Sequence, residues 1–264
     1  MLGKLGVVAT ESPAAARVGR YVLERGGNAV DAAVATVFAV GVARPQSCGI
    51  GGGGFMVYRS ARGRSAALDF RETAPAAFTP TTLQPPGLHS DKPGDRNDFT
   101  GHLTVGVPGT VAGMSAALRR YGSIGLARAI APAARLADRG VTVTPALSKA
   151  MDDNANRLKL FPPAANQYLV AGQTPYPPGA LLKQPDMARS LRAIAKHGTK
   201  AFYRGRIARQ IARDMDNTRA GPQPGDSAAM VQGDLARYSA KWRRPIKGSY
   251  RGRGLIAMPP PTSG

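Results

Sequence analysis

Residues 69–75 read Asp69-Phe70-Arg71-Glu72-Thr73-Ala74-Pro75, and they follow a glycine run at residues 49–56, Gly49-Ile50-Gly51-Gly52-Gly53-Gly54-Phe55-Met56. Between the two motifs, residues 55–59 and 65–70 are typical of strands, and residues 61–64 are typical of the turn that joins them. We therefore predict a β-hairpin directly after the glycine run. This hairpin would place Arg71 at the end of a strand, which is a rigid platform for a ligand-binding side chain.

Helical signals surround this hairpin. Ser12 and Pro13 suit the N-cap and first turn of a helix over residues 14–25, which the following glycines end. A second helix, residues 28–41, is apolar on nearly every side, which is typical of a helix buried within a layered protein. Its one acid, Asp31, is expected to accept hydrogen bonds from backbone N–H groups or a neighbouring loop.

The remaining segments predict more helices and a second pair of strands. Helices are predicted at residues 108–121, 126–139, 145–160, 187–197 and 207–215, strands at 243–249 and 254–258, and loops at 80–101 and 217–229. Helix pairs mixed with hairpins indicate an α+β fold, and we expect residues 1–264 to form a single domain.

Arg71 is the candidate ligand-binding residue. A guanidinium group offers a planar fork that matches a carboxylate in a bidentate way. With apolar Phe70 before it and Glu72 after it, the side chain could lie in a half-buried pocket. The alternative is a structural role, in which Arg71 caps the strand end or pairs with Asp69.

The glycine run has a second possible interpretation. Gly49, Gly51 and Gly54 fit the spacing G-x-G-x-x-G of a dinucleotide-binding loop. That motif requires a strand before it and a helix after it, and here the predicted order is reversed. We therefore interpret the run as a tight turn with close backbone packing.

The net positive charge of the chain is typical of proteins that bind a polyanion. The chain has 36 Lys and Arg residues against 16 Asp and Glu, a net charge of +20, and residues 235–264 contain no acid. In that segment basic residues alternate with Tyr238, Trp242 and Tyr250, as on a nucleic-acid-binding face. Cations are also scattered along the whole chain, and charges on a sheet edge discourage aggregation. We favour a general excess of basic residues and a protective role at a sheet edge, and we do not expect nucleic acid as a partner.

The sequence gives little support for a disulfide-bonded, metal-binding or membrane-spanning protein. The single Cys48, interpreted as a small buried thiol, excludes an internal disulfide and a multi-cysteine zinc site. His89, His102 and His197 lie far apart, so we predict neither a metal nor a cofactor. No apolar stretch reaches the roughly 18–20 residues of a membrane span. The first residues lack the apolar core of a signal peptide.

Taken in order, the motifs resemble those of the γ-glutamyltranspeptidase (glutathione hydrolase) family. The resemblance runs from near Gly6 to the end of the chain. It rests on residues 26–35, 45–46, 51–56, 69–72, 106–113, 202–205, 234–238 and 258–264. It implies part of the αββα layered fold of the N-terminal nucleophile hydrolases, namely the large-subunit half.

The resemblance also implies an activity, without a cofactor. Members hydrolyse or transfer γ-glutamyl groups, as in glutathione breakdown, through an acyl-enzyme on a threonine that self-cleavage exposes. It makes Arg71 the group that binds the γ-glutamyl α-carboxylate, with Glu72 as a possible support. Glutathione and other γ-glutamyl or glutaryl groups all remain open as substrates. The family implies a periplasmic or secreted location.

The resemblance places the nucleophilic threonine beyond Gly264, in the small-subunit half, so we expect no catalytic residue within this chain. Thr81-Thr82 is followed by Leu83 and lacks the family's processing context. The expected partner is therefore the missing half. The alternative is a catalytically inactive remnant that acts as a basic binding module.

The first prediction concerns the chain by itself. Because the resemblance assigns the nucleophile elsewhere, the purified chain should neither hydrolyse a γ-glutamyl anilide nor transfer its γ-glutamyl group. Release of the aniline can be followed by absorbance, in a preparation shown to contain no host enzyme. Sustained turnover by the pure chain would contradict the assignment.

Overall fold

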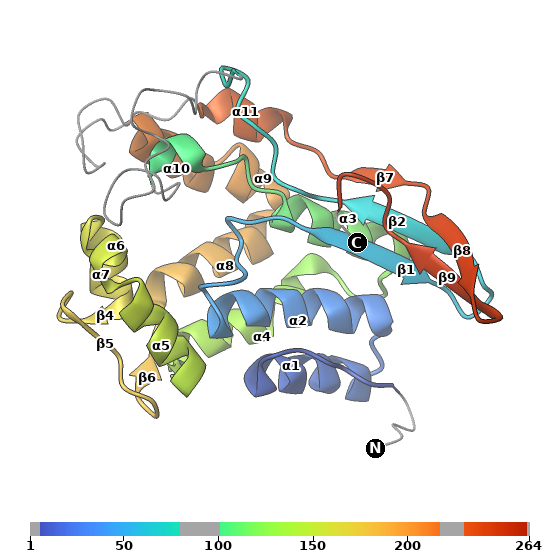
Figure 1. Cartoon of the computed structure of the whole chain (residues 1–264), viewed down its shortest axis with the longest axis horizontal. Helices are drawn as coiled ribbons and strands as arrows, with labels where there is room; N and C mark the ends of the chain where they lie inside the picture. The colour runs from blue at the N-terminus through green and yellow to red at the C-terminus, as the bar shows by residue number, and fades with distance from the viewer. Residues whose placement is uncertain (1–5, 80–100, 217–229, 263–264) are drawn as a thin grey trace.

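The computed structural model describes residues 6–79, 101–216 and 230–262. Helices α1 (Pro13–Glu24), α2 (Ala29–Ala43) and α4 (Leu126–Arg139) pack side by side beneath a small antiparallel sheet (Figure 1). Helix α3 (Thr110–Tyr121) contacts both α2 and the sheet. Helices and strands therefore lie in separate layers, and the predicted α+β class is confirmed.

The central sheet has three strands in the order β1-β2-β7. Strands β1 (Phe55–Arg59) and β2 (Ser65–Asp69) form the predicted hairpin, with Tyr58 opposite Ala66. Strand β7 (Lys241–Arg243) pairs with the other edge of β2. The ladder extends past the strand ends, because Gly54 and Phe70 exchange backbone hydrogen bonds of 3.2 and 3.0 Å.

The remaining elements surround this unit. They are η2 (His102–Thr104), β3 (Val141–Thr142), α5 (Pro145–Asp153), α6 (Ala155–Lys159), α7 (Pro162–Tyr168), β4 (Leu169–Val170), β5 (Thr174–Pro175), β6 (Leu181–Leu182), α8 (Pro185–His197), α9 (Thr199–Tyr203), α10 (Arg206–Asp216), α11 (Gln232–Arg237), β8 (Ile246–Tyr250) and β9 (Arg253–Ala257).

Two predicted elements had wrong boundaries. The helix expected over 145–160 is two helices, because the Asn154 side chain donates to the Ala150 carbonyl at 2.8 Å where α5 ends and α6 begins. The strand expected over 243–249 breaks at Pro245, which has no N–H for a ladder. Helices α7, α9 and α11 and the two-residue strands β3 to β6 were not predicted. The predicted loop at 80–101, apart from Gly101, and the predicted loop at 217–229 lie outside the described residues, and so do Thr81-Thr82 and His89.

Helix α2 forms the centre of the core, as its composition predicts. Its buried residues include Val34, Phe38 and Val42, and it contacts α1, α3 and α4. No helix in the described ranges combines the length and the apolar character needed to cross a membrane. The burial of helix α2 and its contacts with α1, α3 and α4 confirm the prediction that it lies inside a layered protein.

Asp31 is fully buried within α2, and its carboxylate joins the helix to the loop after α3. It accepts hydrogen bonds from Asn28 N–H at 2.9 Å, Ser123 N–H at 2.8 Å, Ser123 Oγ at 2.6 Å and Ile124 N–H at 3.2 Å. Burial by itself raises the pKa of Asp31, but these hydrogen bonds outweigh burial and leave that pKa below its ordinary value. The expectation that Asp31 binds backbone donors is confirmed.

Replacing Asp31 by Asn should destabilise the chain by about 2 kcal/mol at pH 7, because an amide nitrogen cannot accept from these donors. The folded-state pKa of Asp31 is lowered, so its contribution is present above the unfolded-state value of about 3.9 and disappears as pH falls through the folded-state pKa. Urea unfolding at pH 7 and below pH 4 measures the difference. Asp153→Asn, at an exposed pair with Lys149, is the control and should change stability by less than about 0.5 kcal/mol. Equal effects of the two substitutions at pH 7 would contradict the role of Asp31.

Candidate ligand-binding site

A cavity of about 650 Å³ lies where β2 ends and the glycine run begins. Its walls come from three parts of the chain: the glycine run, the segment after β2, and the residues that lead into α3. The lining residues are Gly51, Gly53, Gly54, Phe55, Arg71, Glu72, Thr73, Ala74, Pro75, Phe78, Thr104, Val105 and Gly106. The two motifs that the sequence singles out therefore line one cavity.

Arg71 reaches this cavity with an accessible guanidinium group. Its side chain is 60% exposed, and its Nε lies 3.3 Å from Oε2 of Glu72, which is 34% exposed. The alternative pairing with Asp69 is wrong for the side chain, because the Asp69 carboxylate binds Arg243 at 2.8 Å from Nε and 2.7 Å from Nη2. Glu72 thus contacts the guanidinium and leaves most of it exposed in the cavity.

The backbone of Arg71 is held on both sides. Its N–H donates to Oδ1 of Asp69 at 3.1 Å, and its carbonyl accepts from the Tyr238 hydroxyl at 2.8 Å. Burial, with the nearby negative charges of Asp69 and Glu72, raises the pKa of Tyr238, so the hydroxyl stays a donor at neutral pH. Tyr238 stacks on Tyr203 with ring centroids 5.7 Å apart. These contacts fix the position of the backbone from which the Arg71 side chain extends.

The glycine run packs directly against the segment that carries Arg71. A Cβ on Gly53 would lie 2.5 Å from the Phe70 carbonyl oxygen and 2.8 Å from the Glu72 nitrogen. The carbonyl of Gly52 accepts hydrogen bonds from the N–H groups of Gly109 and Thr110, at 2.8 and 3.0 Å. The N–H groups of Gly109 and Thr110, at the start of α3, are thus bonded to the glycine run. The interpretation of the run as a closely packed turn, with a helix before it and a strand after it, is confirmed.

The histidines and the cysteine of the described residues do not form a further site. The described part of the chain contains no cluster of His, Cys, Asp and Glu that could hold a metal ion. His102 is buried, with its Nε2 3.4 Å from Oδ2 of Asp214, and His197 lies on α8. Cys48 is half-buried, less than predicted, and burial raises the pKa of its thiol, which disfavours the reactive thiolate.

Comparison with known proteins decides the family. The model of the family described as gamma-glutamyltranspeptidase matches residues 15–264. The chain belongs to the γ-glutamyltranspeptidase family. Arg71 and the glycine run lie within the matched range.

Individual relatives agree. This γ-glutamyltranspeptidase-family chain is 40% identical over 263 residues to the glutathione hydrolase proenzyme of Escherichia coli (strain K12), covering 99% of this chain and 43% of the relative. It is 40% identical over 267 residues to the acylase ACY 1 proenzyme of Pseudomonas sp. (strain SE83), covering 99% and 46%. The chain thus spans less than half the length of these relatives.

Solved structures support the fold. The structure of Helicobacter pylori γ-glutamyltranspeptidase matches with a TM-score of 0.91 and 38% identity, over 100% of this chain and 72% of that one. A cephalosporin acylase from Bacillus halodurans matches with a TM-score of 0.82 and 30% identity, over 98% of this chain and 48% of that one. One architecture therefore accompanies more than one acyl-group chemistry.

In this γ-glutamyltranspeptidase-family chain, the basic segment at residues 235–264 has a packed part and an exposed part. Arg243 binds Asp69, and Trp242 packs against Tyr121 and lies under the Arg120 guanidinium, 4.4 Å from the ring centroid. Strands β8 and β9, by contrast, are mostly exposed. Some of the basic and aromatic side chains of residues 235–264 therefore hold the sheet together.

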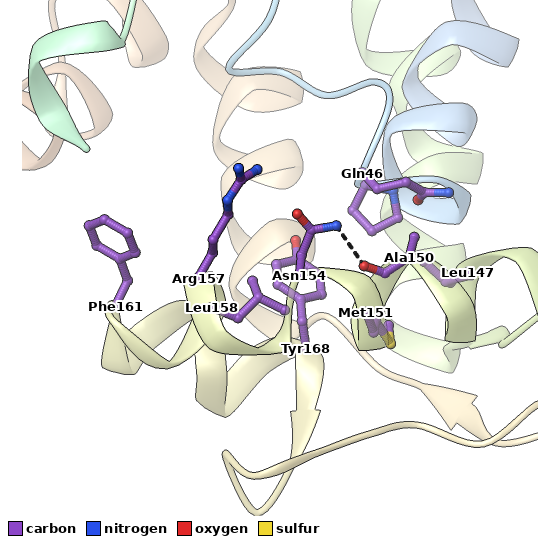
Figure 2. Close-up of a pocket in the computed structure, with 10 residues that line it drawn as sticks. Gln46, Leu147, Ala150, Met151, Asn154, Arg157, Leu158, Phe161 and Tyr168 are labelled. Atoms are coloured by element: carbon purple, nitrogen blue, oxygen red, sulfur yellow. Dashed lines mark hydrogen bonds between the residues drawn. The ribbon is translucent and has the colours of Figure 1, made fainter. Parts of the chain in front are cut away.

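A second cavity, of about 360 Å³, lies between Gln46 and helices α5 to α7 (Figure 2). Apolar side chains such as Leu147 and Met151 line it, and the Asn154 amide beside it is bonded to the Ala150 carbonyl. Its lining includes no acid and no histidine. Most of its lining comes from residues 147–168, and Pro45 and Gln46 complete it. This cavity was not predicted from the sequence.

Gly109 gives a direct test of how the Arg71 segment is held. A Cβ at this position would overlap both the Phe70 carbonyl oxygen and the Tyr238 hydroxyl. Gly109→Ala should therefore destabilise the chain by about 3 kcal/mol, since backbone and an anchored ring must both move. Gly248→Ala on β8, where no atom lies within 4 Å of the added Cβ, should leave stability unchanged or slightly raised. Urea unfolding of both variants measures this, and equal midpoints would disprove the packing argument.

Proposed function

We propose that this chain forms the part of a γ-glutamyl hydrolase or transferase that binds the α-carboxylate of the γ-glutamyl group, in glutathione or a related compound. The observation that carries the proposal is the accessible guanidinium of Arg71 in a cavity of about 650 Å³. Membership of the γ-glutamyltranspeptidase family gives this arginine its chemical meaning. The size of the cavity suits a small peptide.

The geometry supports a carboxylate clamp. Arg71 follows a strand whose ladder continues through Phe70, and its peptide is bonded to Asp69 and Tyr238. A rigid backbone lowers the entropy lost when the guanidinium binds a ligand. Glu72 contacts Nε, which leaves the terminal nitrogens as donors toward a carboxylate. We propose Glu72 as a support that sets the plane of the guanidinium.

The nucleophile belongs to another part of the family's sequence. The resemblance assigns it to an amino-terminal threonine, whose α-amine serves as base and whose hydroxyl attacks the γ-carbonyl. The proposed partner is therefore the small-subunit half, which would complete the cavity beside Arg71. We also propose that residues 1–264 fold as one domain. This is supported by a single cluster of buried apolar side chains that includes residues from Ala15 to Leu235.

The acyl group of the proposed substrate is inferred from the family and from the chemistry of the Arg71 site. Relatives include both glutathione hydrolase and acylase proenzymes at 40% identity. An α-amino group distinguishes a γ-glutamyl group from a glutaryl group, whereas both carry a carboxylate at the position that Arg71 would bind. The family model that matches residues 15–264, gamma-glutamyltranspeptidase, is therefore our reason to favour a γ-glutamyl substrate.

In an active enzyme that contains this chain and the complementary half, Arg71→Ala should raise KM for a γ-glutamyl anilide by about 10- to 100-fold. A charge-assisted bidentate pair contributes about 1.5–3 kcal/mol, and each 1.4 kcal/mol changes affinity tenfold. Arg71→Lys keeps the charge but loses the fork, so it should lie between wild type and alanine. Steady-state kinetics measures both.

Arg62→Ala, at an exposed position in the turn between β1 and β2, is the matched control. It removes one positive charge from the same hairpin without touching the cavity, so KM should stay within about twofold of wild type. Thermal unfolding should be unchanged in all three variants, because both arginines are exposed. A wild-type KM in Arg71→Ala would remove Arg71 from the site.

A further inference from the structure

A groove of about 830 Å³ runs between helices α8, α9 and α10, apart from the Arg71 cavity. Helix α9 packs against both α8 and α10, so the three successive elements form its walls (Figure 1). None of the residues that line it lines the Arg71 cavity. The groove is therefore a separate concave surface.

Positive charge dominates this groove. Its ionisable lining residues are Asp186, Arg189, His197, Lys200 and Arg206, and the single acid, Asp186, pairs with Arg189. The side chains of Lys200 and Arg206 form no hydrogen bond or ion pair with any residue that the structure describes. Within the described ranges, two cations of the groove therefore lack an acidic partner, and His197 lines the same groove.

Local backbone packing brings these two cations together. Gly205 lies between α9 and α10, and a Cβ there would be 3.0 Å from the Ala201 Cα and from the Lys200 carbonyl oxygen. Because glycine has no side chain, the first residue of α10, Arg206, can follow closely on α9, which carries Lys200. The close turn thus places both side chains on the wall of one groove.

We propose that this groove is a binding site for a small molecule with two linked phosphate groups. Lysine acts as a compact point charge toward phosphate, and arginine adds a planar fork of donors. Lys200 on α9 and Arg206 on α10 belong to different walls of the groove, so together they suit a ligand with more than one charged group. The site is independent of γ-glutamyl chemistry.

Pyrophosphate is the probe for this proposal, titrated calorimetrically into the chain at low ionic strength. Replacing Lys200 and Arg206 together by alanine should weaken binding by at least about tenfold, because two charge-assisted contacts are lost. Added salt should weaken wild-type binding as well.

The matched control replaces Lys196 and Arg209 by alanine. These two exposed cations lie on α8 and α10, two of the three helices that form the groove, but do not line it. Removing them subtracts the same net charge but no groove-lining side chain, so only the long-range attraction is reduced and a loss below about threefold is expected. If thermal unfolding shows that the first alanine pair is misfolded, Lys200→Gln with Arg206→Gln replaces it. Equal losses from the groove pair and the control pair, or no saturable binding by wild type, would overturn the proposal.

Discussion

The contact between Phe70 and the start of α3 is the constraint on which the Arg71 site depends. The Phe70 ring lies against Gly113 and its carbonyl oxygen against Gly109, with no room for a methyl group at either position. In the same place Gly52 accepts two hydrogen bonds from the beginning of α3. Sheet, glycine run and helix therefore meet at one residue, and the next residue is Arg71. Interiors packed this tightly deform little, so the position of Arg71 is set by the fold.

A second constraint comes from far along the chain. Asp69 and Arg243 are joined across 174 residues, and Tyr238 reaches the Arg71 carbonyl across 167. Both contacts come from the segment that ends in β7, so the pairing of β7 with β2 supports the site as well as extending the sheet. The basic and aromatic residues there are partly explained by this role. Arg243 compensates a buried acid, and Trp242 covers Tyr121.

Local signals predicted the parts of the fold that local interactions determine. Asn28 and Asp31 form a capping box that starts α2, and Gly140, with φ of 94°, ends α4 where predicted. The predicted helix over 145–160 failed because Asn154 bonds to the backbone instead of continuing it. No local pattern could predict that Asp69 binds Arg243 in preference to the Arg71 side chain, since loop closure over that distance depends on the whole fold.

The strength of the proposed clamp depends on what surrounds it. With Arg71 60% exposed, a guanidinium–carboxylate pair in this cavity is close to the solvent-exposed regime, in which such pairs contribute little. The same pair becomes much stronger as the effective dielectric constant falls. Any segment that covers the cavity would therefore strengthen ligand binding without adding a contact of its own. In the proposed clamp, a rigid, correctly placed arginine would supply the specificity and enclosure would supply the affinity. If the proposed small-subunit half provides both the enclosure and the nucleophile, binding and catalysis would depend on the same assembly step.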